Sequence, residues 1–235
     1  MAAMPTRAVL FDFDGVLAGT EPLHCAAFAA VASTASLPFS RQDYYDRFLG
    51  LPDRACLAAL HAAAGRPWSE RELDALLARK RAEFARLAQD AALYGGVAAT
   101  LRRLHAVFIL AVASGAWRDE IEPILVRAQV RSLFAAIIGA EDVRAGKPAP
   151  DPFLRALEAI NRRHGTHLRP ADCVVVEDAP LGIAAARAAG MACIAVTTHR
   201  DRTALAGADA FVADLNQLQP EDLMGQEGSA HGSRD

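Results

Sequence analysis

The fold is decided by Arg7-Ala8-Val9-Leu10-Phe11-Asp12-Phe13-Asp14-Gly15. An apolar run of four residues leads into two aspartates that a single phenylalanine separates. A short apolar run of this kind is typical of a strand buried in a parallel sheet. Open α/β sheets place their sites beyond the carboxyl ends of such strands. The sequence therefore predicts a strand over residues 7–11 with Asp12 and Asp14 at the functional edge of a sheet.

The two aspartates are candidates for metal-assisted phosphoryl transfer. Neighbouring carboxylates repel each other, and a bound Mg²⁺ relieves that repulsion. One carboxylate can then attack phosphorus while the other handles the proton of the leaving group. The alternative is a surface turn, since Asp-Phe-Asp-Gly is also ordinary turn composition. The motifs further along the chain decide between these two interpretations.

The rest of the chain alternates short apolar segments with helical patterns. Strands are predicted at residues 107–113, 136–139, 173–176 and 192–196, and helices at residues 120–129, 152–163 and 181–189. Such alternation predicts an α/β core with a doubly wound, Rossmann-like, mostly parallel sheet.

The segment after the first strand has a different character. Residues 20–92 are rich in Ala, Leu and Arg at helical spacing, with no convincing strand. Ser69 and Glu72 form a capping box for a long helix, and Ser40 is expected to cap another. We therefore predict an all-helical cap over residues 20–92, inserted into a catalytic core of residues 1–19 and 93–224. The small, polar residues 225–235 are predicted to be disordered.

Composition limits the classes of partner. The chain has 235 residues, 52% of them hydrophobic, which is enough to bury a core without oligomerisation, and a monomer is expected. Its formal net charge of −3 gives no basic field for a nucleic acid or an anionic membrane. A small soluble substrate fits better. The four cysteines are too scattered for a zinc site or a disulfide framework.

A membrane location is not predicted either. Asp12 and Asp14 interrupt the N-terminal apolar stretch before a signal-peptide core could form. Elsewhere the sequence has no apolar run of the ~18 residues that a membrane span needs. A cytoplasmic location is expected.

Ser114 and Lys147 are candidates for holding phosphoryl oxygens. Ser114-Gly115 directly follows the strand predicted at residues 107–113, where a hydroxyl and backbone N–H groups can bind an anion, although Ser-Gly is also a simple helix cap. Lys147 lies in Gly146-Lys147-Pro148-Ala149-Pro150-Asp151, a loop stiffened by two prolines. Lys80 and Lys147 are the only lysines among 25 basic residues, which favours a compact ammonium at residue 147 over a solvated surface lysine.

Glu177 and Asp178 are candidates for metal ligation. They end the apolar segment Val174-Val175-Val176, and a buried parallel strand rarely ends in adjacent acids without a partner. Together with Asp12 and Asp14 they offer the hard oxygen ligands that Mg²⁺ prefers. Asp178 could instead cap the helix that follows, which would account for one acid only.

The order of these motifs resembles that of the haloacid dehalogenase superfamily, over essentially the whole chain. The matching segments are Phe11–Leu17, Ala113–Gly115, Gly146–Asp151 and Val176–Ile183. The helical insertion resembles the type 1 cap of the β-phosphoglucomutase and phosphoglycolate phosphatase group. The resemblance implies that Asp12 is a nucleophile that becomes an aspartyl-phosphate, and that Asp14 is the general acid and base. It also implies that Ser114, Gly115 and Lys147 hold the phosphoryl group, and that Mg²⁺ is bound by Asp12, the Asp14 carbonyl and Asp178, with Glu177 alongside.

The chain departs from this pattern in two places. Gly19 stands where the family usually has an aspartate at the cap hinge, whereas His24 is retained and either reaches the site or is structural. Mutase members carry polar and basic residues after the motif-two serine, and here only Arg118 could grip a second phosphate. A phosphatase acting on a sugar phosphate or a phosphoglycolate-like metabolite is therefore favoured over a phosphomutase. The intact motif acids and lysine disfavour a non-catalytic binding module.

Two cap residues are predicted to contact the leaving group. Arg54 lies in a Gly/Pro-containing break between helical segments, the kind of loop that can reach into a cleft, or is a surface arginine at a helix start. Lys80 resembles the cap-helix lysines of the phosphoglucomutase group, or lies on a solvated helix face. Specificity on a shared fold resides in such variable residues, so the sequence does not name the substrate.

Overall fold

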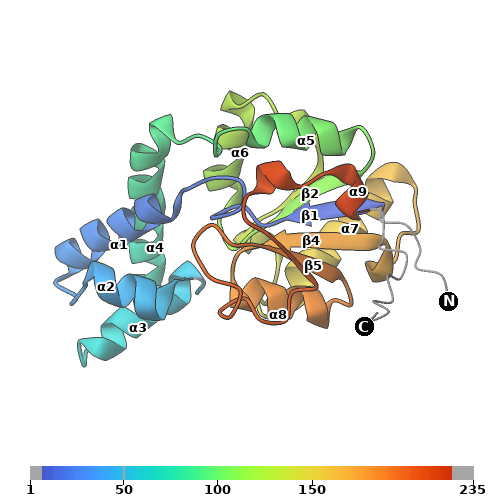
Figure 1. Ribbon diagram of the computed structural model, residues 1–235. Coiled ribbons are helices and arrows are strands. Elements are labelled where there is room, and N and C mark those ends of the chain that lie inside the picture. The colour runs from blue at the N-terminus through green and yellow to red at the C-terminus, as the bar shows by residue number, and fades with distance from the viewer. Residues whose placement is uncertain (1–6, 50, 224–235) are drawn as a thin grey trace, which may run out of the picture.

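The core of the computed structural model, which describes residues 7–49 and 51–223, is one six-stranded sheet in the order β3-β2-β1-β4-β5-β6 (Figure 1). All neighbouring strands are parallel. The strands are β1 Ala8–Phe11, β2 Ile109–Ala113, β3 Phe134–Ile138, β4 Cys173–Glu177, β5 Ala192–Val196 and β6 Ala210–Val212. The predicted doubly wound sheet is confirmed, and β6 is an additional strand that was not predicted.

Helices cover both faces of the sheet. One face packs against α5 (Val97–His105) and α6 (Arg118–Arg127), and the other against α7 (Asp151–His164) and α8 (Pro180–Ala188). In β1, Val9 and Phe11 join the first layer while Ala8 and Leu10 join the second, because successive strand residues point to opposite faces. A short helix, α9 (Pro220–Leu223), ends the described chain. Helices α5 and α9 were not predicted, whereas α6, α7 and α8 lie within two residues of their predicted bounds.

The register of the central strands places the motifs side by side. Phe11 of β1 is level with Val112 of β2 and with Val176 of β4. The residues that follow these three therefore emerge at one edge. The order of strands reverses at β1, with β2 on one side and β4 on the other, which is where open α/β sheets bind ligands.

The insertion is helical, as predicted. Its elements are α1 (Glu21–Ala35), α2 (Arg41–Asp43), the π-helical turn η1 (Tyr44–Phe48), α3 (Asp53–Ala63), α4 (Glu70–Leu87) and the short 3-10 turn η2 (Ala88–Asp90). They stand together beside the carboxyl edge of the sheet, at the left of Figure 1, around their own apolar core. Ser40 Oγ accepts a hydrogen bond from the Asp43 N–H and Ser69 Oγ one from the Glu72 N–H, which confirms both serines as N-caps. Of the capping box predicted for Ser69 and Glu72, the structure shows this half.

The predicted boundaries of the cap and core stay a prediction, and the predicted tail at 225–235 lies outside the described residues. The remaining 3-10 turns are η3 Arg131–Leu133, η4 Ala140–Asp142, η5 Pro170–Asp172 and η6 Leu215–Gln217. In residues 7–49 and 51–223, no helix is both long enough and apolar enough to cross a membrane.

Candidate active site

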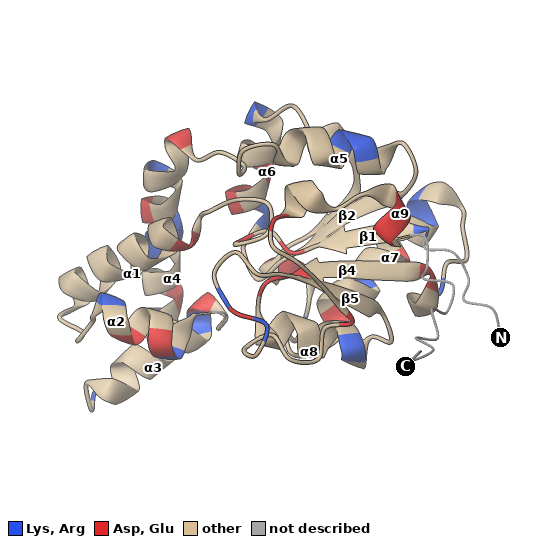
Figure 2. Ribbon diagram, in the orientation of Figure 1, with Lys and Arg blue, Asp and Glu red and all other residues tan. Residues whose placement is uncertain are grey.

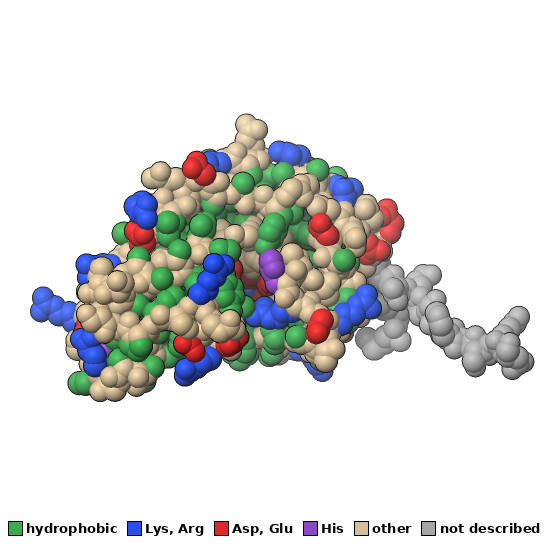
Figure 3. All heavy atoms as spheres, turned by 60° about the vertical axis from the view of Figure 1, so that its left-hand side comes forward, with side chains coloured by type: hydrophobic (Ala, Val, Ile, Leu, Met, Phe, Trp, Pro, Cys, Tyr) green, Lys and Arg blue, Asp and Glu red, His purple; other side chains and the backbone are tan. Residues whose placement is uncertain are grey.

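A cleft of about 720 Å³ lies between the cap and the carboxyl edge of the sheet. It is visible as the hollow in the middle of the face in Figure 3, and Figure 2 shows acidic segments gathered at the ends of the central strands. Most of the predicted site residues line it, namely Asp12, Asp14, His24, Ser114, Gly115, Lys147, Glu177 and Asp178. Strands β1, β2 and β4 and the loop before α7 deliver all of them except His24, which lies on cap helix α1.

Lys147 holds the predicted nucleophile. Its Nζ donates to Asp12 Oδ1 at 2.6 Å and also to Glu177 Oε1. Burial raises the pKa of Asp12 to about 7, although the Lys147 ammonium opposes this shift. Burial would favour a neutral amine at Lys147, but the carboxylates of Asp12 and Glu177 outweigh it and raise the lysine's pKa. The Lys147 side chain is only 12% exposed, so the alternative of a solvated surface lysine is wrong.

Glu177 fixes the position of the Lys147 ammonium. Its Oε2 accepts hydrogen bonds from the backbone N–H groups of Asp178 at 2.9 Å and Ala179 at 3.0 Å, which leaves Oε1 for Lys147. The carboxylate packs directly over Gly182, where an added Cβ would lie 1.7 Å from Oε1. A glycine at the start of α8 therefore makes room for Glu177, and Glu177 in turn sets the position of Lys147.

Asp12, Glu177 and Asp178 form an acidic cluster that suits a divalent cation. One oxygen from each lies within 4.8 Å of the others, and all three residues are buried. Burial, together with the charges of Glu177 and Asp12, raises the pKa of Asp178 to about 8. Lys147 contacts Asp12 and Glu177, and Arg200 acts on Asp178, so two cations face three carboxylates. The hard oxygen donors of this cluster match Mg²⁺. The Asp14 carboxylate stands outside this cluster, and ligation by its carbonyl stays a prediction.

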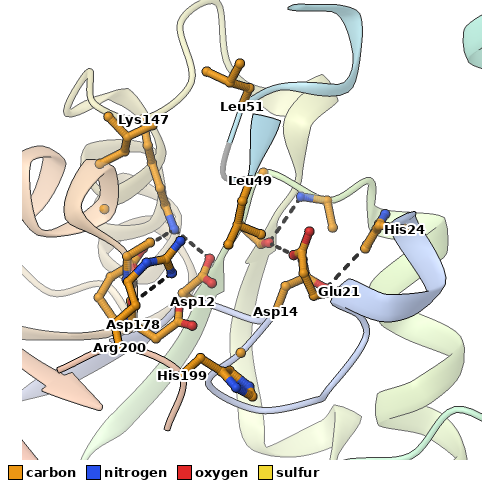
Figure 4. A pocket seen from close by; sticks show the side chains of 18 of the residues that line it. Asp12, Asp14, Glu21, His24, Leu49, Leu51, Lys147, Asp178, His199 and Arg200 are labelled. Carbon is orange, nitrogen blue, oxygen red and sulfur yellow. Dashed lines mark hydrogen bonds and ion pairs between the residues drawn. The ribbon is translucent and has the colours of Figure 1, made fainter. Parts of the chain in front are cut away.

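Asp14 faces the cap rather than the acidic cluster (Figure 4). Its Oδ1 accepts a hydrogen bond from the Thr20 hydroxyl and lies 3.4 Å from His24 Nε2, while its Oδ2 accepts one from Ser114 Oγ at 3.4 Å. Burial would raise the pKa of Asp14, but the facing His24 imidazole and the Thr20 hydroxyl outweigh it and lower the pKa. Groups from both cap and core thus fix the predicted acid/base.

Lys80 is not where either sequence interpretation put it. Its side chain is fully buried, so the solvated helix face is wrong. Its Nζ lies 2.8 Å from His24 Nδ1, 2.7 Å from Asp53 Oδ2 and 3.0 Å from Glu120 Oε1. Lys80 is not among the cleft-lining residues, so the structure gives no support to a direct contact with the leaving group. It touches the site through His24.

Two further predicted substrate ligands also lie away from the cleft. Arg54 pairs with Glu70 and, at 2.6 Å, with Asp74, both on the outer side of the cap. Arg118 Nη2 pairs with Asp142 at 2.6 Å. Neither arginine lines the cleft. Both predictions are unsupported because nearby carboxylates bind each exposed guanidinium outside the cleft. Which carboxylates are near depends on how the helices pack, and the local sequence gives no sign of it.

The cleft also contains residues that were not predicted. They are Glu21, Pro22, Tyr44, Tyr45, Leu49, Leu51, Pro52, Asp53, Tyr94, Leu181, His199 and Arg200, with several small residues between them. Gly19 lies at the same mouth, and an added Cβ there would come within 2.9 Å of the Tyr94 ring. Tyr94 Oη in turn lies 2.8 Å from His199 Nε2. The glycine at the cap hinge therefore allows an aromatic ring to pack against the linker.

Comparison with known proteins places the chain in a family. The sequence profile of the haloacid dehalogenase-like hydrolases matches residues 9–196, and the chain belongs to that family. The predicted family is thereby confirmed.

Its relatives include named phosphatases. The validoxylamine A 7'-phosphate phosphatase of Streptomyces hygroscopicus subsp. limoneus is 31% identical over 91% of this chain and 96% of its own length. The phosphorylated carbohydrates phosphatase of Thermotoga maritima is 32% identical over 93% and 96%. These matches confirm the predicted enzyme class, a phosphoric monoester hydrolase.

The fold also matches solved structures. A β-phosphoglucomutase from Clostridium difficile superposes with a TM-score of 0.81, at 22% identity, over 92% of this chain and 95% of that one. At that identity the likeness shows the fold alone.

Proposed function

We propose that this protein is a Mg²⁺-dependent phosphatase that hydrolyses a small phosphorylated metabolite through an aspartyl-phosphate on Asp12. The observation that carries the proposal is the pairing of Asp12 with Lys147 at 2.6 Å, at the bottom of an open cleft, with Asp14 facing the same space from the other side. A nucleophile, a fixed cation and a separate acid/base are what phosphoryl transfer in two half-reactions needs.

Each residue of the site has its own role in the proposed reaction. The Asp12 carboxylate attacks phosphorus while Lys147 and the Ser114 hydroxyl hold the phosphoryl oxygens. Asp14 gives a proton to the leaving oxygen and later takes one from the water that releases phosphate. The pKa of Asp14 is lowered without substrate, and an arriving phosphate dianion raises it, because a like charge nearby disfavours the carboxylate. Mg²⁺ bound by Asp12 and Asp178 would neutralise charge on the transferring group.

A phosphomutase is disfavoured by the positions of the cations. A mutase must hold a second phosphate at the far end of its substrate, and Arg118, the residue expected to do so, is paired with Asp142 outside the cleft. The phosphatase names of the validoxylamine phosphate and phosphorylated carbohydrate relatives support the same choice, and a sugar phosphate is therefore the first substrate class to try.

The test is turnover of the purified chain with Mg²⁺ on a panel of sugar and short-chain phosphates, reading free phosphate and isomerised product separately. Phosphate release without isomerisation is expected. Isomerised product would favour the mutase, and full activity in excess EDTA would remove the metal from the proposal.

A further inference from the structure

The two walls of the cleft differ in chemistry. The core wall carries the charged groups Asp12, Lys147, Asp178 and Arg200. The cap wall presents mainly apolar side chains, those of Pro22, Tyr45, Leu49, Leu51 and Pro52. In Figure 4, Leu49 and Leu51 of the cap lie above Asp12 and Asp14.

The backbone holds this apolar wall in place. The π-helical turn η1 ends with the Leu49 N–H donating to the Tyr44 carbonyl at 2.9 Å, and the Leu51 N–H donates to the Phe48 carbonyl at 2.9 Å. Single π-helical turns of this kind often occur at functional sites. The Tyr44 hydroxyl donates to Glu21, which ties the turn to α1. Leu51 is 38% exposed at the mouth of the cleft, although a large aliphatic side chain gains from burial.

Charge on the cap side disfavours a second anion. Within the described part of the cap, the charged residues that line the cleft are the acids Glu21 and Asp53, with His24 at the bottom and no lysine or arginine. Arg54, the nearest candidate in the sequence, is occupied by Glu70 and Asp74 on the outside. A phosphate or carboxylate that reached the cap side would meet carboxylates and leucines, because Arg200, the lining arginine, lies on the core wall beside Asp178.

We infer that the leaving group is uncharged and carries a planar ring with apolar faces, such as a nucleobase or a phenyl group, seated on Tyr45, Leu49, Leu51 and Pro52. This inference rests on the proposed phosphatase function and replaces sugar phosphates in general, as the substrate class, with phosphate monoesters that carry such a ring. A cleft of about 720 Å³ holds a group of this size beside the phosphate. Bisphosphates and densely hydroxylated sugars would leave the apolar wall without a partner.

The test compares substrates with the same kind of leaving oxygen. Benzyl phosphate and glycerol 1-phosphate are both esters of primary alcohols, and uridine 5'-monophosphate differs from ribose 5-phosphate by its base. We expect the ring-bearing member of each pair to have a kcat/KM at least about tenfold higher, the size of discrimination that an apolar pocket gives. Ribose 1,5-bisphosphate is expected to be the poorest substrate.

Variants of Leu49 and Leu51 test whether the apolar wall causes the preference for ring-bearing substrates. Leu49→Ser and Leu51→Ser should each lower the ratio of kcat/KM for benzyl phosphate over glycerol 1-phosphate by about tenfold. The matched control is Leu154→Ser, because Leu154 is 40% exposed on α7, away from the cleft, and this change should leave the ratio as in wild type.

The outcomes separate the two proposals. Preference for the ring-bearing substrates, lost in the Leu49 and Leu51 variants, supports the inference. Hydrolysis of all four monophosphates at similar rates, or a preference for the ring-free members, overturns the inference and leaves the phosphatase proposal standing. No phosphate release from any of them in the presence of Mg²⁺ overturns both.

Discussion

Lys80 Nζ in cap helix α4 lies 3.0 Å from Glu120 Oε1 in core helix α6, and both residues are buried. The other oxygen of the same carboxylate accepts a hydrogen bond from the Trp117 N–H at 2.9 Å. Glu120 therefore also fixes the backbone between Ser114 and the start of α6. A second contact runs alongside, in which the Arg81 guanidinium lies 4.0 Å from the Trp117 ring centroid and pairs with Asp119. Cap and core are thus joined by buried charge as well as by two linkers.

Removing Lys80 should destabilise the protein strongly. Lys80→Ala leaves the buried Glu120 carboxylate and the partly exposed Asp53 carboxylate without their cation, and breaking a buried pair from one side costs about 3–5 kcal/mol. Urea unfolding measures the loss. The matched control is Arg86→Ala on the same helix, because Arg86 forms only an exposed pair with Glu83 and its loss should not change stability measurably. Similar midpoints for the two variants would contradict the buried cluster.

A double-mutant cycle tests whether Lys80 and Glu120 act on each other. Glu120→Gln alone should destabilise, but in the Lys80→Met background it should cost much less, since the buried charge it would otherwise leave unpaired is already gone. Residues in direct contact couple by about 0.5–3 kcal/mol, whereas independent sites add. Additive losses would mean that the 3.0 Å contact contributes nothing to stability.

Replacing Lys147 by Arg should fail almost as badly as replacing it by Ala. The ammonium is held between Asp12 and Glu177 with its side chain 12% exposed, and a planar guanidinium cannot take the place of a compact charge there. Loss of one preorganised donor costs about 10²–10³ in kcat. The measurement is kcat on p-nitrophenyl phosphate, with circular dichroism to confirm folding. An Lys147→Arg enzyme with most of its activity would refute this role.

Variants of Asp12 and Asp14 should block different steps of the reaction. Asp12→Asn removes the nucleophile and should abolish turnover. Asp14→Asn keeps the nucleophile and should slow turnover by about 10²–10⁴, the usual contribution of general acid–base catalysis. Acid quenching followed by mass spectrometry should then find phosphate attached to Asp12 in the Asp14 variant, because release needs the base. Turnover within threefold of wild type would show that another group carries the proton.

The motif residues could be predicted from the sequence because their chemistry is local. Asp12 and Ser114 each follow a short apolar strand and Glu177 ends one, and parallel strands bring such positions to one edge. Helix α5 could have been found as well, since Val97, Leu101 and Leu104 repeat at helical spacing. Strand β6 could not, because it is three residues long and incompletely buried.

The cap contacts could not be predicted, because they depend on pairings far apart in the chain. Lys80 meets Glu120 across 40 positions and Arg54 meets Asp74 across 20. Competition among nearby carboxylates decides which cation reaches the cleft, and that competition exists only after the helices have packed. For the same reason the sequence does not show that the Arg81 guanidinium packs against the Trp117 ring at the boundary between cap and core.

The acidic cluster should bind Mg²⁺ in the absence of substrate. Asp178→Asn removes one of the three buried carboxylates and should weaken Mg²⁺ binding measured by isothermal titration calorimetry, as well as turnover. Asp142→Asn serves as the control, because Asp142 pairs with Arg118 outside the cleft and its change should leave the titration unaltered. Equal Mg²⁺ affinity for wild type and the Asp178 variant would exclude that residue as a ligand.

Gly182→Ala should inactivate the enzyme although it leaves Asp12, Asp14 and Lys147 in the sequence. An added Cβ would lie 1.7 Å from Glu177 Oε1 and 2.0 Å from the carboxyl carbon, so we expect the Glu177 carboxylate to move. Lys147 would lose the partner that holds it beside Asp12, and misplacement by about 1 Å can cost ~10²-fold in rate. Gly95→Ala is the control, since a Cβ there meets nothing within 4 Å. If Gly182→Ala retained wild-type kcat, the chain of contacts from Gly182 through Glu177 to Lys147 would not govern the position of the lysine.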